Sequence, residues 1–186
     1  MDISFFNFCL LASLFFCMGC KSPQDEIKGK IEEMMTKPVF VPYNRMLLWT
    51  RDSIIHSPNT NTEYKLVVYT DSAHCTECEM RKIYLWNDFV KLEHKYNGHF
   101  RVIFIVQASS KSSVKNIISA LNHYEVEYPM YVDSTSTFSK MNPHIPSEDM
   151  YHVFLLDEKD SVVLVGNPQF NSKIENKLLQ ILEKNK

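Results

Sequence analysis

The chain has 186 residues, with 20 basic and 22 acidic side chains and a formal net charge of −2 at pH 7. This length suits one domain with an ordinary hydrophobic core, since 45% of the residues are apolar. The sequence shows no basic patch, so a nucleic-acid partner is not expected.

The first segment predicts targeting out of the cytoplasm. Ile3–Met18 is almost wholly apolar, and the first positive charge is Lys21. This run is short for a spanning helix and is typical of the hydrophobic region of a signal peptide. Its end resembles a bacterial lipoprotein signal, in which a cysteine after a small residue is lipidated and becomes the new N-terminus. The resemblance implies that Met1–Gly19 is removed and Cys20 acylated; an uncleaved N-terminal anchor is the alternative.

Three residues of this segment depart from the usual lipoprotein pattern. Cys17 and Met18 replace a leucine and a small residue, and Asp2 lies where basic residues are expected. An upstream start codon or a relaxed recognition sequence would account for them. With either a lipid or an uncleaved anchor, we expect the chain at a membrane, in the periplasm or at the cell surface of a Gram-negative bacterium.

The cysteine count leaves one pair of thiols in the mature chain. Of the five cysteines, Cys9 and Cys17 would be removed and Cys20 acylated. Cys75 and Cys78 remain, too few for a structural disulfide framework. The domain is therefore expected to be stabilised by its hydrophobic core.

A polar tether is predicted at residues 20–38. Four apolar residues within it have the spacing of a weak amphipathic helix: Ile27, Ile31, Met34 and Met35. A plain spacer between lipid and domain is the preferred interpretation. Pro38 ends this segment, after which Val39–Val41 is predicted as a first strand and Met46–Trp49 as a candidate second strand.

The stretch from Tyr64 to Val90 predicts a buried strand, a turn and a helix. Tyr64–Tyr69 is an apolar run rich in β-branched and aromatic residues, typical of a strand buried on both faces. Thr70–Ser72 supplies turn and capping residues. An apolar stripe then continues at helical spacing: Met80, Ile83, Trp86, Phe89 and Val90.

Two cysteines lie in the first turn of this predicted helix. The three-residue spacing of Cys75 and Cys78 puts both sulfur atoms on one face. The unpaired N–H groups and the positive end of the helix dipole favour the thiolate of Cys75, which makes it a nucleophile near neutral pH. Cys78 can then close a disulfide on Cys75, so the pair can store two electrons.

A CxxC sequence also has other interpretations. Half of a zinc site would need two further ligands, and no second cysteine pair of this kind would remain in the mature chain. A pair that merely staples the chain is compatible with the spacing. A strand, a turn and then CxxC at the start of a helix is the context of a redox motif, so redox chemistry is preferred. Metal handling and a structural pair stay open.

The remaining elements alternate between strands and helices until a final hairpin. Phe100–Val106 is a second buried strand and Tyr128–Asp133 a short strand, with an amphipathic helix between them. His152–Leu156 and Ser161–Val165 are joined by the turn Asp157–Asp160, and a last amphipathic helix follows. This order predicts an α/β domain with a mixed central sheet, parallel through crossover helices and antiparallel at the hairpin.

With these elements the chain resembles the thioredoxin-like superfamily, and within it the membrane-tethered periplasmic thiol–disulfide oxidoreductases of the cytochrome-maturation and peroxiredoxin-like branch. Four segments carry the resemblance: KLVVY, CTEC, YPMYVD and FLLDEKDSVVLVG. The resemblance implies a thioredoxin-like fold over residues 39–186 with helices on both faces of the sheet. It also implies that Cys75 attacks a protein disulfide, that Cys78 resolves the mixed disulfide, and that an upstream donor supplies electrons. No cofactor or metal is expected.

Two positions depart from the family pattern. The family has a cis-proline just before the strand matched by Phe154; here Tyr151 stands there, and Pro146 is five residues earlier. In the family that proline packs against the dithiol, orients substrate and discourages metal binding. The family's buried acid, six residues before the first cysteine, is matched by Tyr69, and a phenol is a poor base at neutral pH. The nearby Asp71 is expected to cap the helix or face solvent.

Three further side chains are predicted to tune the dithiol. Glu77 lies between the cysteines, where its negative charge raises a thiol pKa and favours a reducing or weakly poised protein. His74, when protonated, opposes this effect, but a surface turn residue is an equal interpretation. His152 follows the cis-proline position and could approach the dithiol, although a solvent-facing strand histidine is the preferred interpretation.

Two other classes of function remain. A copper chaperone of the thioredoxin fold would use both cysteines with His74 or His152, because thiolates and imidazole suit Cu(I). The chaperones of that kind usually carry CxxxC, which argues against it. A non-catalytic binding lipoprotein would recognise a partner through exposed aromatic residues and keep the cysteines as a structural disulfide.

Overall fold

The computed structural model of the chain describes residues 22–51, 62–73, 76–109 and 113–184. The chain divides into two compact units, residues 1–30 and residues 31–186. The predicted signal peptide and Cys20 lie outside the described residues, so their processing stays a prediction. Within the described ranges, no helix is both long enough and apolar enough to cross a membrane.

Helix α2, Pro23–Thr36, begins in the first unit and ends in the second. At its start the Ser22 N–H donates to Asp25 Oδ2 and the Asp25 N–H donates to Ser22 Oγ, both at 3.2 Å. Near its end Met34 is 0% exposed, in a core cluster of the second unit. The weak amphipathic helix considered for this segment is therefore present over Pro23–Thr36, and its last turns contribute to the folded core, which a plain spacer would not do.

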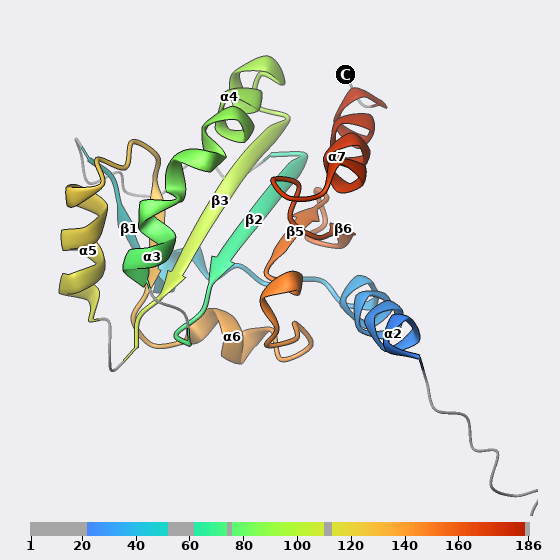
Figure 1. The fold of residues 1–186 in the computed structure, drawn as a ribbon, viewed down its shortest axis with the longest axis horizontal. Helices are drawn as coiled ribbons and strands as arrows, with labels where there is room; N and C mark the ends of the chain where they lie inside the picture. Colours follow the sequence, from blue (N-terminus) through green and yellow to red (C-terminus); the bar gives the residue numbers. More distant parts are fainter. Residues whose placement is uncertain (1–21, 52–61, 74–75, 110–112, 185–186) are drawn as a thin grey trace, which may run out of the picture. The chain divides into compact units, whose positions relative to one another are not determined.

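One six-stranded sheet lies at the centre of the second unit (Figure 1). Its strands are β1 (Leu47–Trp49), β2 (Tyr64–Thr70), β3 (Phe100–Gln107), β4 (Met130–Asp133), β5 (Val153–Leu156) and β6 (Val162–Val165). Their order across the sheet is β1-β4-β3-β2-β5-β6. β2, β3 and β4 run parallel, whereas β1, β5 and β6 pair antiparallel with their neighbours. The predicted mixed sheet, with β2 and β3 as adjacent parallel strands, is confirmed.

The sheet begins later than the sequence predicts. Val39–Val41 forms no strand, and beside it only Pro38 makes an isolated bridge, to Ser161 of the hairpin. The candidate second strand Met46–Trp49 is present as β1. Val39 and Val41 are nevertheless buried, so their apolar character reflects core packing instead of strand pairing.

The helix predicted to follow the cysteines is broken into three pieces. They are α3 (Thr76–Arg81), the 3₁₀ helix η2 (Ile83–Trp86) and α4 (Asn87–Lys95). The predicted apolar stripe is buried along all three, at Met80, Ile83, Trp86 and Phe89. The helical period therefore identified the buried face correctly but could not show the break, since a 3₁₀ turn keeps residues three apart on nearly the same face.

Helices lie on both faces of the sheet, as predicted. Leu66 of β2 belongs to a core cluster that includes residues of α3, α4, α5 (Val114–His123) and α7 (Ser172–Lys184). The next residue, Val67, belongs to the opposite cluster, with residues of α6 (Thr137–Met141) and the 3₁₀ helix η3 (Asp149–Tyr151). The short 3₁₀ helix η1 (Tyr43–Arg45) precedes β1. Because successive side chains of a strand point to opposite faces, β2 contributes to both clusters.

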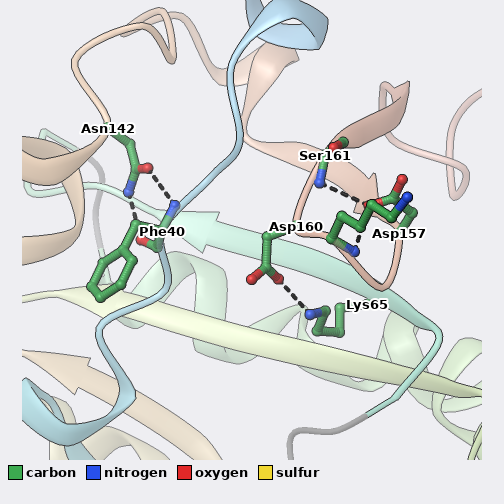
Figure 2. Close-up of polar contacts among 7 residues, drawn as sticks. Phe40, Lys65, Asn142, Asp157, Asp160 and Ser161 are labelled. Carbon is green, nitrogen blue, oxygen red and sulfur yellow. Dashed lines mark hydrogen bonds and ion pairs between the residues drawn. The ribbon is translucent and has the colours of Figure 1, made fainter.

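The segment before η1 is held by one buried amide. The side-chain Oδ1 of Asn142 accepts from the Phe40 N–H at 2.8 Å, and its Nδ2 donates to the Phe40 carbonyl at 2.8 Å (Figure 2). The Val39 N–H donates to the carbonyl of Asp160 at 2.8 Å. These hydrogen bonds hold in place a segment that is not part of any strand of the sheet.

The predicted hairpin turn between β5 and β6 is present. Asp157 Oδ1 accepts from the Lys159 and Ser161 N–H groups, each at 2.9 Å. Asp160 adopts a left-handed conformation, with φ at 59°, and its carboxylate forms an ion pair with the buried ammonium of Lys65 (Figure 2). The one charged side chain inside β2 is therefore paired by the hairpin turn.

Candidate functional site

The carboxyl end of β2 leads directly to the cysteine motif. After the strand, Asp71 Oδ1 accepts from the Ala73 N–H at 2.8 Å, so Asp71 caps this turn. Cys78 lies in the first turn of α3, half-buried and disulfide-bonded. Three predicted site residues lie outside the described part of the structure, in whole or for their side chains: His74, Cys75 and Glu77. Of the two cysteines of the motif, the structure therefore describes Cys78, and the site is located from the surroundings of that residue.

Tyr69, which stands at the position of the family's buried acid, is 7% exposed and faces a second polar side chain. Its hydroxyl donates to Gln107 Oε1 at 2.6 Å, and Ser139 Oγ donates to the same oxygen at 3.1 Å. Burial raises the pKa of Tyr69 to about 12, with smaller contributions in the same direction from the carboxylates of Asp71 and Asp133. Tyr69 therefore stays protonated at neutral pH and acts as a hydrogen-bond donor.

Tyr151, at the position of the family's cis-proline, ends η3 and is buried in the cluster that contains Phe138 and Phe154. No cis peptide bond occurs among the residues that the structure describes. A buried tyrosine ring thus occupies the place where the family pattern has a proline. The next residue, His152, is bonded through its backbone to Tyr69 near the carboxyl end of β2.

His152 is 4% exposed, so the preferred interpretation of a solvent-facing strand histidine is wrong. Its backbone carbonyl accepts from the Tyr69 N–H at 2.9 Å, which places it beside the carboxyl end of β2. Its ring meets the Tyr69 ring edge-on, with centroids 4.9 Å apart. Its Nε2 lies 3.0 Å from the carbonyl oxygen of Pro146. The histidine is buried because the η3 turn delivers it inward just before β5 begins.

A small hollow of about 170 Å³ adjoins these residues. It is lined by Tyr69, Gln107, Ser139 and His152 and extends to Asp71 and Ser72, the turn that precedes the cysteines. Phe138, Asn142 and Pro146 are among the residues that close it. A hollow of this size with several polar walls has room for water.

A larger groove of about 610 Å³ also borders Tyr69 and His152. Glu79 of α3 and Lys82, which follows that helix, line it, together with His152 and the loop after β6. Much of its wall is apolar, from Leu85, Trp86, Met150, Val153, Phe170 and Ile174. Phe170 is 76% exposed, an unusual position for a phenylalanine side chain. Chain segments just before and just after the cysteine motif therefore border two separate hollows, and His152 lines both.

Sequence reasoning missed several residues of this site. Gln107 is the first polar side chain after the apolar run of β3, and its position two residues beyond Ile105 on the same strand face was a usable signal. Ser139 and Phe170 carried no such signal, since they come from a short helix and a loop that only the tertiary fold brings here. Among the described residues, no group of three His, Cys, Asp or Glu side chains is placed to hold a metal ion.

The order of the elements defines the class of fold. A central parallel strand leads into the helix that carries the motif, its parallel neighbours lie on one side, and an antiparallel hairpin completes the sheet on the other. This is a thioredoxin-like α/β fold with a mixed sheet and helices on both faces. The predicted fold class is confirmed.

Comparison with known proteins gives matches among solved structures. The chain is similar to a domain of a possible thiol-disulfide isomerase from Cytophaga hutchinsonii (14% identity, TM-score 0.47, covering 68% of this chain and 80% of that one). It is also similar to the thioredoxin domain of a thiol-disulfide oxidoreductase from Bacteroides vulgatus (14% identity, TM-score 0.45, covering 66% of this chain and 81% of that one). A thioredoxin-like protein in its oxidised form is similar as well (14% identity, TM-score 0.44, covering 66% of this chain and 80% of that one). No family model and no curated protein matches the chain.

Proposed function

We propose that the protein is a membrane-anchored thiol–disulfide oxidoreductase that acts on protein disulfides outside the cytoplasm through Cys75 and Cys78. The observation that carries this proposal is the disulfide-bonded Cys78 in the first turn of α3, directly after the central strand. Cys75 is its proposed partner, since it lies three residues earlier and the other cysteines lie within the first twenty residues.

The proposed reaction is a pair of thiol–disulfide exchanges. The Cys75 thiolate attacks one sulfur of a client disulfide, so a Cys75–client bond forms and the client's other sulfur leaves as a thiolate. The Cys78 thiolate then attacks Cys75, so the protein disulfide forms and the second client sulfur is released. The client gains two electrons and two protons, and the dithiol loses them. An upstream thiol donor outside this chain restores the reduced pair.

The apolar groove beside α3 supports a protein client. Its exposed Phe170 and Met150 offer the kind of surface to which an unfolded or flexible apolar segment binds. Glu79 and Lys82 border the same groove and add polar contacts close to the motif. A client held there would present its disulfide next to the first turn of α3.

The side chains around the dithiol favour a reducing or weakly poised protein. Glu77 places a negative charge beside the cysteines, which disfavours the thiolate and stabilises the disulfide relative to a strongly oxidising protein. His74 opposes this effect only when it is protonated. The reduction potential of the pair measures the balance, and a strongly oxidising value would contradict the proposed direction.

The proposed location follows from the lipoprotein-like N-terminus. A lipid on Cys20 would hold the domain at a membrane of a Gram-negative bacterium, in the periplasm or at the cell surface. In that oxidising setting an unregulated dithiol would not stay reduced, so the protein needs its upstream donor.

Trapping variants test the function. Cys78→Ser leaves a reactive Cys75 without a resolving partner and should accumulate a client-linked species that reductant releases. Cys75→Ser is the matched control and should trap little. If neither variant traps a client and both reduced cysteines alkylate at the same rate, the disulfide is a structural staple. Tight Cu(I) binding by the reduced wild-type protein under the same conditions would instead support the copper interpretation.

A further inference from the structure

The end of α2 is joined to the loop after α6 by apolar and polar contacts. Met34 of α2, 0% exposed, belongs to the core cluster against which Ile145 of that loop packs. The side-chain amide of Asn142 binds both backbone groups of Phe40, in the segment that leaves α2 (Figure 2). The Ile145 N–H donates to the Asn142 carbonyl at 3.0 Å, which closes a turn. His144 lies inside this turn and therefore beside the chain that leaves α2.

His144 has a ring nitrogen that is buried without a hydrogen-bond partner. Its Nε2 is out of contact with solvent, and no donor or acceptor among the described residues reaches it. The imidazolium form carries a hydrogen on both ring nitrogens, so protonation would bury an N–H donor and a positive charge where no acceptor is present. The packed loop therefore accommodates the neutral ring better than the charged one.

The charges around His144 favour the same neutral form. Burial lowers the pKa of His144, the ammonium of Lys37 lowers it further, and the carboxylate of Glu33 acts in the opposite direction. Glu33 and Lys37 already form an ion pair with each other at 3.6 Å. In α6 the charged residue nearest in sequence is Lys140, whose ammonium donates to the Thr135 carbonyl. A charged imidazole would thus meet a nearby cation and a carboxylate that is already engaged.

We propose that acid releases the last turns of α2, residues 31–36, from the loop after α6, and that protonation of His144 triggers the release. The released ring reaches water, where both of its N–H groups find acceptors. Met34 leaves the core in the same step, and the cost of exposing it keeps the contact closed while the ring is neutral. Release lengthens the free chain between Cys20 and the sheet, so the reach of the domain from its proposed lipid depends on pH. This inference does not depend on the proposed oxidoreductase function.

The direction of the pH dependence follows from proton linkage. In the packed state the pKa of His144 is below the ordinary histidine value of about 6.5, and in the released state it returns to that value. The released state therefore binds more protons below about pH 6.5. The contact is at full strength above that pH and weakens as the pH falls from there towards the packed-state pKa. One such group can raise the release equilibrium by at most about 30-fold at about pH 5.

Hydrogen exchange at single amides of the full-length protein in detergent measures the release. Protection of residues 33–36 is compared at about pH 7.5 and about pH 5, after correction for intrinsic exchange rates, with the β3 amides as the internal reference. We expect the protection in α2 to fall several-fold in acid, by no more than about 30-fold, while β3 keeps its protection. Unchanged protection in α2, or an equal loss in β3, would overturn the proposal.

His144→Gln separates the proton from the packing. A glutamine amide is polar and planar but cannot take up a proton, so its α2 protection should be nearly the same at both pH values. His123→Gln, at an exposed position of α5, is the matched control and should respond to acid like the wild type. Lys37→Gln removes the nearby cation, so the pKa of His144 should rise and the acid response should shrink. An acid response of wild-type size in His144→Gln would assign the release to another group.

An NMR titration of the His144 ring tests the same point in the wild type, without relying on a variant that folds. The ring should titrate below the ordinary histidine value of about 6.5. A midpoint at or above that value would show that the packed loop does not resist the imidazolium, and the proposal would fail.

Discussion

The side-chain amide of Asn142 binds both backbone polar groups of Phe40, a residue 102 positions earlier in the chain. The same Nδ2 also donates to the Phe138 carbonyl at 2.8 Å, so one buried amide joins α6 to the segment before β1. Asn142→Ala would leave these buried groups without partners and should lower the free energy of unfolding by about 2–3 kcal/mol. Urea denaturation measures the loss.

Asn122→Ala, at an exposed position of α5, is the control and should change stability by no more than about 0.5 kcal/mol. Equal unfolding midpoints for the two variants would show that the Phe40 segment does not depend on Asn142.

The ion pair between the buried Lys65 and the half-exposed Asp160 should respond unequally to loss of its two partners. Asp160→Asn keeps a residue that tolerates φ of 59° but leaves a buried ammonium without its counter-charge, which we expect to cost about 2 kcal/mol. Lys65→Met replaces the cation by an apolar side chain of similar length in a sheet interior and should cost less. Thermal unfolding at neutral pH compares them, and a more stable Asp160→Asn would contradict the pairing.

Tyr69 should make the protein sensitive to alkali. Its folded-state pKa, about 12, lies above the ordinary tyrosine pKa of about 10, so the folded state favours the protonated phenol. The phenol's contribution to the free energy of unfolding is fully present below about pH 10. It is lost as the pH rises through 12, and the total loss is about 1–3 kcal/mol. Tyr69→Phe should lose about 1 kcal/mol at neutral pH with the bond to Gln107, and decline less steeply in alkali.

Unfolding by urea across the alkaline range provides the measurement, and Tyr84→Phe, at an exposed tyrosine, is its control. Parallel alkaline declines for Tyr69→Phe and wild type would contradict the raised pKa.

The groove predicts selective effects on protein clients. Phe170→Ser should lower kcat/KM for a protein disulfide about tenfold, as expected for the loss of one apolar side-chain contact. It should leave the rate with a small aromatic disulfide unchanged. Phe40→Ser is the matched control, because Phe40 is also exposed, at 54%, but lies outside the groove. Equal losses with both substrates would show that Phe170 acts on the dithiol and not on the client.

The lipid proposed on Cys20 leads to a prediction about anchoring. Cys20→Ala should release the protein from membranes or leave an unprocessed precursor, because the proposed acyl chains would supply the membrane affinity. Fractionation and mass spectrometry of the mature protein check this. Detection of Met1 on the mature wild-type chain would show that the segment is an uncleaved anchor.

The sequence by itself determined the elements whose signal is local. The apolar runs at Tyr64–Tyr69 and Phe100–Val106, the hairpin around Asp157–Asp160 and the position of Cys78 in a helical first turn were all predicted and found. Each depends on side-chain period, turn chemistry or short spacing, which neighbouring residues encode. The alternation of strands and helices then restricted the fold to a mixed sheet.

Only the tertiary structure decided how distant residues meet. Met34 looked like part of a spacer because an isolated amphipathic turn does not reveal whether a core exists to receive it. His152 looked like an exposed strand residue because its burial depends on η3, on Pro146 and on Tyr69, 83 positions earlier. The meeting of Tyr69 with Gln107 follows from the parallel register of β2 and β3, which no local pattern specifies. Contacts of this kind form because the folded chain must bury apolar surface and satisfy every buried polar group at once.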